Sequence, residues 1–227
     1  SSVDKAEAAL QDGDFYVYLE RDKDELWQPT IGMASSRGKI DQIQGAVNNN
    51  LIPTGQLENI KEFIKENGLS CNSGVKDEGP KALQQILIGE KLAAYDESTG
   101  KTLEKAIKDK DGVSVLKMLG NKVEINPDGT YKIGTYKPQL LLKPQSGIVV
   151  PYSFMGIDED KLLSNVEVIN GDLILYNKNP LFSSYITKFP EKLKFVSGKI
   201  LCSKEQYSMF GDDMLRVVSN KSQIIVY

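Results

Sequence analysis

The sequence predicts an α+β protein: an antiparallel N-terminal meander with helices, then a C-terminal β-rich repeat or coil-like segment. Three observations support this prediction. Short strand-forming runs separated by turns fill most of the first 45 residues. Segments with apolar residues at helical spacing follow, up to about residue 119. A strand-rich pattern that repeats itself occupies the last third of the 227 residues.

Strand-forming runs predict the meander at residues 15–19, 27–34 and 39–44. Pro29 lacks a backbone N–H, so we expect the second strand to start at an edge of the sheet. Gly38 opens the third strand and Gly45 ends it. The Ala-rich residues 3–11 predict a short helix before the meander.

Apolar residues at helical spacing predict four helices, at residues 54–64, 80–95, 102–109 and 113–119. Thr54 suits the cap of the first helix and Gly68 its end. Pro80 suits the first turn of the second helix. We expect these helices to cover one face of the meander, in an α+β unit of residues 1–120. Residues 121–227 then form a β-rich unit, or continue as one domain.

The last third contains an internal repeat. Three similar segments, VEVINGDLIL, LKFVSGKILC and LRVVSNKSQIIV, begin at residues 166, 193 and 215, at intervals of 27 and 22 residues. Both intervals fit the ~20–29 residues of leucine-rich repeats. Each segment has two strand-forming halves on either side of a small polar pair, which we call the pivot: Asn170-Gly171, Ser197-Gly198 and Ser219-Asn220. Three unrelated hairpins of a sandwich are the alternative interpretation. Before the repeat, Asn126-Pro127-Asp128-Gly129 predicts a hairpin.

Composition excludes several functions. The hydrophobic and charged fractions, 40% and 26%, are those of a globular protein. The net charge of −3 and the lack of a basic run argue against nucleic acid as a partner. No run approaches the ~20 apolar residues of a membrane span. The start, Ser1 to Asp4, has no signal-peptide character, and we interpret it as processed or as the start of an excised piece.

The chain has no histidine and only two cysteines, Cys71 and Cys202. Ser-His-Asp and Cys-His catalysis and a Cys/His zinc site therefore lack their residues. We expect free thiols, no metal and no cofactor. Cys202 alternates with apolar residues and is expected in the core. Cys71 lies in a polar loop, where a nearby lysine or a helix N-terminus would have to activate it.

Three motifs resemble known sites but lack required residues. Ser98 to Thr102 resembles the end of a phosphate-binding loop, yet Tyr95 stands where that loop needs glycine. Asp109 to Gly112 resembles a calcium loop without its first and last carboxylates. Asp158 to Asp160 clusters three carboxylates, which are better placed to cap a short helix than to act as an acid–base pair.

Two stretches resemble known proteins. Residues 13–18, 29–33 and 38–45 resemble the start of large, uncharacterised bacterial proteins. The C-terminal segments are similar to the irregular leucine-rich-like coils of bacterial effector proteins, without the usual asparagine ladder. Together they cover about half of the chain. The resemblance implies a bacterial or phage origin and an interaction role, in the cytoplasm or in a reducing host cytosol.

We therefore predict a protein-binding module of a bacterial protein, with an effector or a phage-related protein as the expected kind. Aromatic residues and one arginine near predicted turns are the candidate binding residues: Tyr16, Tyr18, Trp27, Arg37, Tyr152 and Phe154. Tyr152 and Phe154 belong to a loop expected to be exposed. The alternative is a histidine-free transferase or hydrolase that uses carboxylates, tyrosine, arginine or Cys71. A phage or virion structural piece is a third hypothesis, and the oligomeric state stays open.

Overall fold

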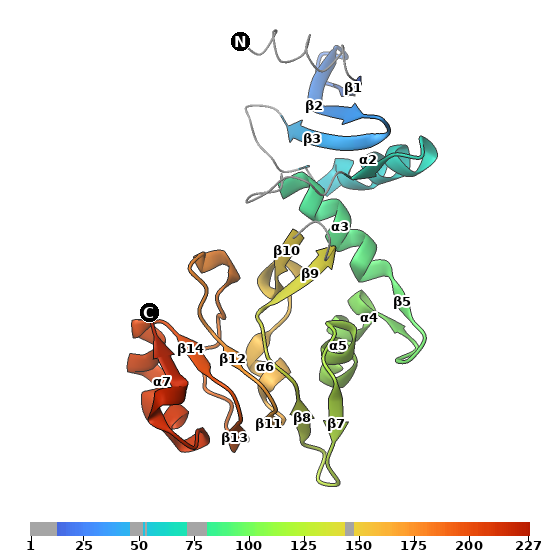
Figure 1. Ribbon diagram of the computed structural model, residues 1–227. Helices are drawn as coiled ribbons and strands as arrows, with labels where there is room; N and C mark the ends of the chain where they lie inside the picture. The colour runs from blue at the N-terminus through green and yellow to red at the C-terminus, as the bar shows by residue number, and fades with distance from the viewer. Residues whose placement is uncertain (1–12, 46–51, 53, 72–80, 144–147) are drawn as a thin grey trace. The chain divides into compact units, whose positions relative to one another are not determined.

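The computed structural model describes residues 13–45, 52, 54–71, 81–143 and 148–227 (Figure 1). The chain forms two compact units: unit 1 contains residues 1–90 and 141–148, and unit 2 contains residues 91–140 and 149–227. Helices and several sheets occur together, which confirms the predicted α+β class. The domain boundary expected at residue 120 stays a prediction. The helix expected at residues 3–11 lies outside the described residues.

Unit 1 is built on a four-stranded sheet in the order β1-β2-β3-β4. Its strands are β1 (Asp14–Arg21), β2 (Trp27–Ser36), β3 (Lys39–Gly45) and β4 (Ser70–Cys71). The first three pair antiparallel, which confirms the predicted meander, and β4 joins β3 in parallel. Arg37 and Gly38, both with positive φ, form the two-residue turn between β2 and β3.

Pro29 lies near the start of β2, and the described pairing of β2 with β3 begins only at Ile31. Among the described residues, Pro29 therefore pairs with β1 alone, in agreement with its expected position at an edge. It stands opposite Leu19, where the register between β1 and β2 shifts after Tyr18. An irregularity of this kind interrupts the ladder of hydrogen bonds, so a residue without an N–H is tolerated there.

The helix α2 (Thr54–Glu66) covers one face of this sheet. Ile60 and Ile64 of α2 share a buried cluster with Ile31 and Met33 of β2. The helix ends before Gly68, whose φ of 60° is easy for glycine. The next helix, α3 (Lys81–Ala93), adds Ile86 to the cluster and continues into unit 2. The two helices that follow belong to unit 2, and the expectation that they cover the meander stays a prediction.

Unit 2 starts with two short strands and two short helices that pack together. They are β5 (Tyr95–Asp96), β6 (Lys101–Thr102), α4 (Leu103–Lys108) and α5 (Gly112–Met118). Thr102 caps α4 and Asp111 caps α5 through side-chain oxygens. The helix α5 also packs against α6 (Glu159–Leu163). The strands β9 (Gln139–Lys143) and β10 (Ile148–Pro151) pair with each other and include residues of both units.

The rest of unit 2 is a stack of successive turns of the chain, which we call coils. The strands of neighbouring coils pair in two sheets. The first sheet, in the order β13-β11-β8-β7, contains β7 (Val123–Ile125), β8 (Tyr131–Ile133), β11 (Val166–Ile169) and β13 (Phe195–Val196). The second, in the order β12-β14-β15, contains β12 (Leu173–Ile174), β14 (Ile200–Cys202) and β15 (Ile224–Val226). The helix α7 (Lys204–Val217) leads from β14 toward β15. Within these two sheets, as far as the structure describes them, β7 and β8 alone form an antiparallel pair, at the predicted hairpin.

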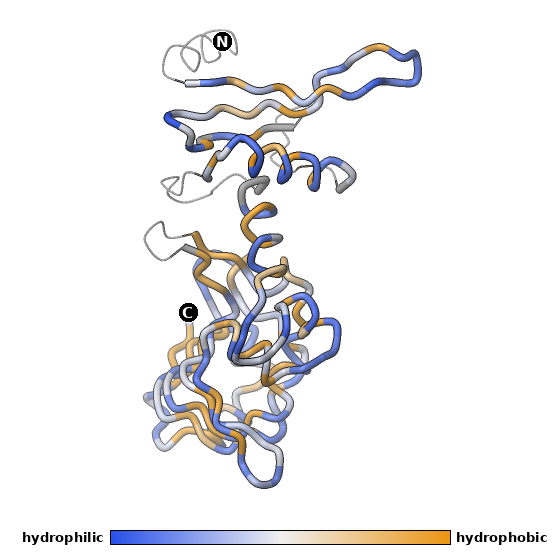
Figure 2. The backbone as a smooth tube through the Cα atoms, turned by 90° about the vertical axis from the view of Figure 1, so that its right-hand side faces the viewer, coloured by the Kyte–Doolittle hydropathy of each residue, from blue (hydrophilic) through white to orange (hydrophobic). Residues whose placement is uncertain are grey.

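The repeat segments pair in parallel, as stacked coils do, and not as hairpins of a sandwich. Val168 pairs with Phe195 and Leu173 pairs with Ile200, so both strands keep the interval of 27 residues. Ile200 pairs with Ile224 after the two extra residues of the third segment. Apolar stretches lie next to one another in neighbouring coils (Figure 2). Equivalent positions are therefore buried together, as Ile133, Ile169 and Val196 are.

The pivots of neighbouring coils touch through their backbones. The N–H of Gly198 donates to the carbonyl of Gly171 at 2.9 Å. The third segment has Asn220 where a glycine would stand. There the side-chain amide of Gln223 donates to the carbonyl of Gly198 at 2.7 Å and continues the ladder.

We predict that Gly198→Ala destabilises the protein by about 1–3 kcal/mol, because the coils have no room for a side chain at this pivot. A Cβ on Gly198 would lie 2.6 Å from the Gly171 carbonyl oxygen. Urea denaturation measures the loss. Gly134→Ala is the matched control, since no atom lies within 4 Å of its Cβ position. Equal stability of the two variants would contradict the close approach of the pivots.

Candidate functional site

The predicted binding residues Tyr16 and Tyr18 lie on the inner face of the unit 1 sheet. The ring of Tyr16 packs edge-on against Phe63 of α2, with 5.1 Å between ring centres. The hydroxyl of Tyr18 accepts a hydrogen bond of 2.8 Å from the Asn59 side chain. Both rings are only partly buried, but they face α2 and not the open side of the sheet.

Alternation along β1 places other side chains on the open side. Phe15, Val17 and Leu19 are 41%, 47% and 48% exposed. Trp27, the predicted residue at the start of β2, stands opposite Arg21 and is 59% exposed. The Arg21 guanidinium lies over the Trp27 ring, 4.8 Å from the ring centre. This cation–π contact orients the Trp27 ring. We call Phe15, Val17, Leu19 and Trp27 the outer row.

The hairpin that ends the outer row is acidic. Residues 20–25 contain four carboxylates and two basic side chains. Arg21 is paired with Glu25 at 2.8 Å. Hydrogen bonds from Gln28 and from the backbone of the turn hold the pKa of Asp22 below its usual value. The apolar row therefore runs into a region of negative charge.

The second predicted aromatic region differs from expectation. Tyr152 is 2% exposed in a short 3-10 helix (Tyr152–Met155), so its expected exposure was wrong. Its ring packs edge-on against Tyr136, with 6.1 Å between centres, and burial raises its pKa. Phe154, two residues further on, is exposed.

A buried carboxylate, Glu159, joins α6 to a neighbouring loop. It accepts hydrogen bonds from the Tyr136 hydroxyl, from the Ser184 hydroxyl at 3.0 Å and from the Tyr185 N–H at 2.9 Å. Burial raises its pKa, partly offset by these donors. Its two oxygens are occupied by protein groups, so the arrangement anchors the loop and does not present a reactive acid.

The three motifs with missing residues form ordinary local structure. Ser98 to Thr102 belongs to the β5–β6 hairpin, where Asp96 accepts a 2.8 Å hydrogen bond from the Ser98 N–H. Asp111 caps α5 and pairs with Lys101 at 2.8 Å. Asp158 caps α6 as expected, by accepting from the Lys161 N–H at 3.2 Å.

Of the two cysteines, the structure describes the thiol of Cys202 alone. Cys202 lies in the core as expected, and burial raises its pKa to about 11, which disfavours the thiolate. Cys71 ends β4, and its side chain lies outside the described part of the chain.

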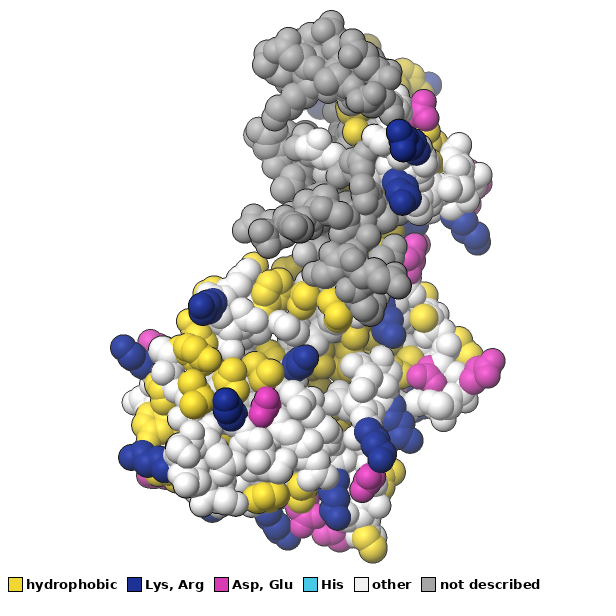
Figure 3. Space-filling model, in the orientation of Figure 1, with side chains coloured by type: hydrophobic (Ala, Val, Ile, Leu, Met, Phe, Trp, Pro, Cys, Tyr) yellow, Lys and Arg dark blue, Asp and Glu magenta, His cyan; other side chains and the backbone are white. Residues whose placement is uncertain are grey.

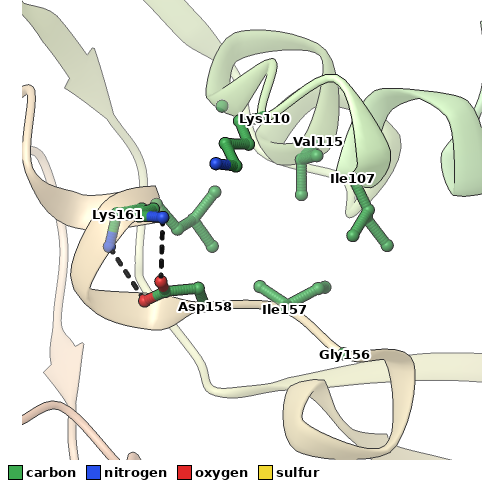
Figure 4. Close-up of a pocket in the computed structure, with 9 residues that line it drawn as sticks. Ile107, Lys110, Val115, Gly156, Ile157, Asp158 and Lys161 are labelled. Carbon is green, nitrogen blue, oxygen red and sulfur yellow. Dashed lines mark hydrogen bonds and ion pairs between the residues drawn. The ribbon is translucent and has the colours of Figure 1, made fainter.

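A cavity of about 170 Å³ lies in unit 2 between the α4–α5 turn and the start of α6. Figure 4 shows Lys110, Lys161 and Asp158 toward one end, and Ile107, Val115 and Ile157 toward the other. We call it the Lys110–Lys161 cavity. Elsewhere on the face of unit 2 drawn in Figure 3, basic and acidic side chains are interspersed.

Comparisons with protein-family models, with curated proteins and with solved structures find no match. Within the described residues, no helix has both the length and the apolar composition to cross a membrane. The function must therefore be inferred from the chain's own surfaces and cavities.

The sequence did not predict two groups of residues, most of the outer row and the lining of the Lys110–Lys161 cavity. Apart from Trp27, the outer row was missed because Phe15 to Leu19 are all hydrophobic or aromatic, so alternation alone does not identify the inner face. The cavity was missed because the α4–α5 turn and residues 156–162 contribute to it without any shared motif. The charged turn beside Trp27 was the one sequence signal for an exposed side.

We predict that Glu159→Gln changes how stability depends on pH. The folded protein binds the Glu159 proton more tightly than the unfolded chain, whose pKa is near 4.5. This contribution is present below the unfolded pKa and is lost as the pH rises through the folded pKa. The unfolding free energy of the wild type, minus that of the variant, should fall across this window by up to about 1.4 kcal/mol per pH unit. Urea denaturation at a series of pH values measures it, and a flat difference would contradict the raised pKa.

Proposed function

We propose that this protein is a protein-binding module, and that its outer row accepts an apolar strip of a partner protein. One observation supports the proposal most strongly. Four large apolar side chains lie exposed along one sheet face, with Arg21 orienting the ring of Trp27. Contiguous exposed apolar surface is typical of interaction sites, and tryptophan is enriched among residues that dominate binding energy.

The charges beside the row indicate the chemistry of the partner. The hairpin tip at residues 20–25 has an excess of two negative charges, and one of its two cations, Arg21, is already paired. Because complementary potentials steer association and exclude wrong partners, we expect basic residues beside the partner's apolar strip. Binding should therefore weaken as salt is added.

The other sequence-based expectations remain predictions. These are the bacterial origin, the effector-like role, the location and the remaining binding residues, Tyr16, Tyr18, Arg37, Tyr152 and Phe154. The outer row differs from that set in all but Trp27.

We predict that Val17→Asp and Leu19→Asp each weaken partner binding by about 2 kcal/mol or more, because each places an unpaired charge within an apolar contact. The partner is captured with the full chain, purified and titrated against each variant. Trp27 is the single tryptophan, so covering it should shift its fluorescence to shorter wavelength.

Ile125→Asp is the matched control, since Ile125 is 59% exposed on β7, a strand of unit 2 that does not belong to the outer row. It should bind as the wild type does. Equal binding by the Val17→Asp and Leu19→Asp double variant would contradict the proposal. A wild-type dimer that this double variant splits would also contradict it, because the row would then bind a second copy.

A further inference from the structure

We propose that the Lys110–Lys161 cavity binds a small monocarboxylate whose apolar body is about the size of a benzene ring. The site lies wholly within unit 2 and is independent of the outer row. It is formed by two turns, the α4–α5 turn and the turn from Gly156 into α6.

The size of the cavity limits the ligand. Its volume of about 170 Å³ is well below the ~300–1,000 Å³ of pockets for drug-sized molecules. It is close to the ~150 Å³ of an apolar cavity that holds benzene in another protein. Ile107, Val115, Ile157 and Leu162 supply apolar walls, so a single ring or a short branched chain fits.

The charged side chains at one end of the cavity favour a ligand with a singly negative head group. Two ammonium groups, of Lys110 and Lys161, share one end with a single carboxylate, Asp158. Asp158 lies 3.7 Å from the Lys161 ammonium group and also caps α6. One positive charge is then left over, which matches a monoanion. Ammonium groups hydrogen-bond to a carboxylate strongly, whereas a neutral head group gains less.

Lys110 is available for this role. Its neighbours Asp109 and Asp111 are already engaged, Asp109 with Lys105 at 2.8 Å and Asp111 with Lys101 at 2.8 Å. Among the residues that the structure describes, no ion pair joins Lys110 to a carboxylate.

The backbone conformation of Lys110 also supports a binding role for this residue. Its φ of 57° is a left-handed conformation at the end of α4, where glycine is the usual residue. A side chain at such a position is unfavourable for folding, and strained positions of this kind cluster at binding sites. Binding of a ligand by the Lys110 ammonium group, which lies at the cationic end of the cavity, explains why a lysine stands at this position.

The test is a titration of the isotope-labelled full chain with benzoate at low ionic strength, followed by backbone amide shifts. We expect saturable shifts confined to residues 107–115 and 156–162. Benzamide, which lacks the charge, and acetate, which lacks the ring, should each bind at least about tenfold more weakly.

Variants separate the cavity from nonspecific attraction to surface lysines. Lys110→Gln and Lys161→Gln should each weaken benzoate binding about tenfold. Lys108→Gln is the matched control, since Lys108 is exposed on α4 and does not line the cavity. Ile157→Phe should block binding by filling the apolar end.

Lys110→Gly is the sharpest variant, because a structural role and a binding role predict opposite results. Glycine suits the left-handed backbone, so the unfolding temperature should stay or rise while benzoate binding falls about tenfold. Shifts that spread without saturation, or Lys110→Gln and Lys161→Gln binding as Lys108→Gln does, would overturn the proposal. Inorganic phosphate binding as tightly as benzoate would overturn it too, because the apolar end would then contribute nothing.

Discussion

The backbone contact between neighbouring pivots is the constraint on which unit 2 depends. The N–H of Gly198 reaches the carbonyl of Gly171, and the N–H of Lys199 reaches the Asp172 carboxylate at 2.7 Å. Such short contacts permit only one register between the coils. With the register set, equivalent apolar positions face the same interior, and burial of their side chains stabilises the stack.

The same stack holds the cavity in place. One side of α6 faces the coils, where Glu159 binds the loop at Ser184 and Leu163 is fully buried. The other side presents Lys161 and Leu162 to the cavity. A short helix of five residues has little stability alone, so its position depends on these tertiary contacts. In unit 1, helices cover one face of the sheet, and the outer row on the other face is exposed.

Sequence reasoning succeeded where local pattern and packing agree. The interval of 27 residues between the first two segments is also the register of their strands. It missed the preceding coil, because Tyr131 pairs with Val166 across 35 residues that include an inserted strand pair and α6. It also did not identify the inner face of β1, because the packing of Tyr16 against Phe63 is a long-range contact. Turns far apart in sequence form the cavity for the same reason.

Nuclear Overhauser effects between backbone protons of the repeat segments can show whether these coils stack in parallel. Parallel stacking predicts contacts between strands at a constant offset of 27 residues, from Val168 to Phe195 and from Ile174 to Leu201. Antiparallel hairpins would give contacts whose offset changes by two at each step along the strand. That second pattern would contradict the stack, and with it the positions of α6 and the cavity.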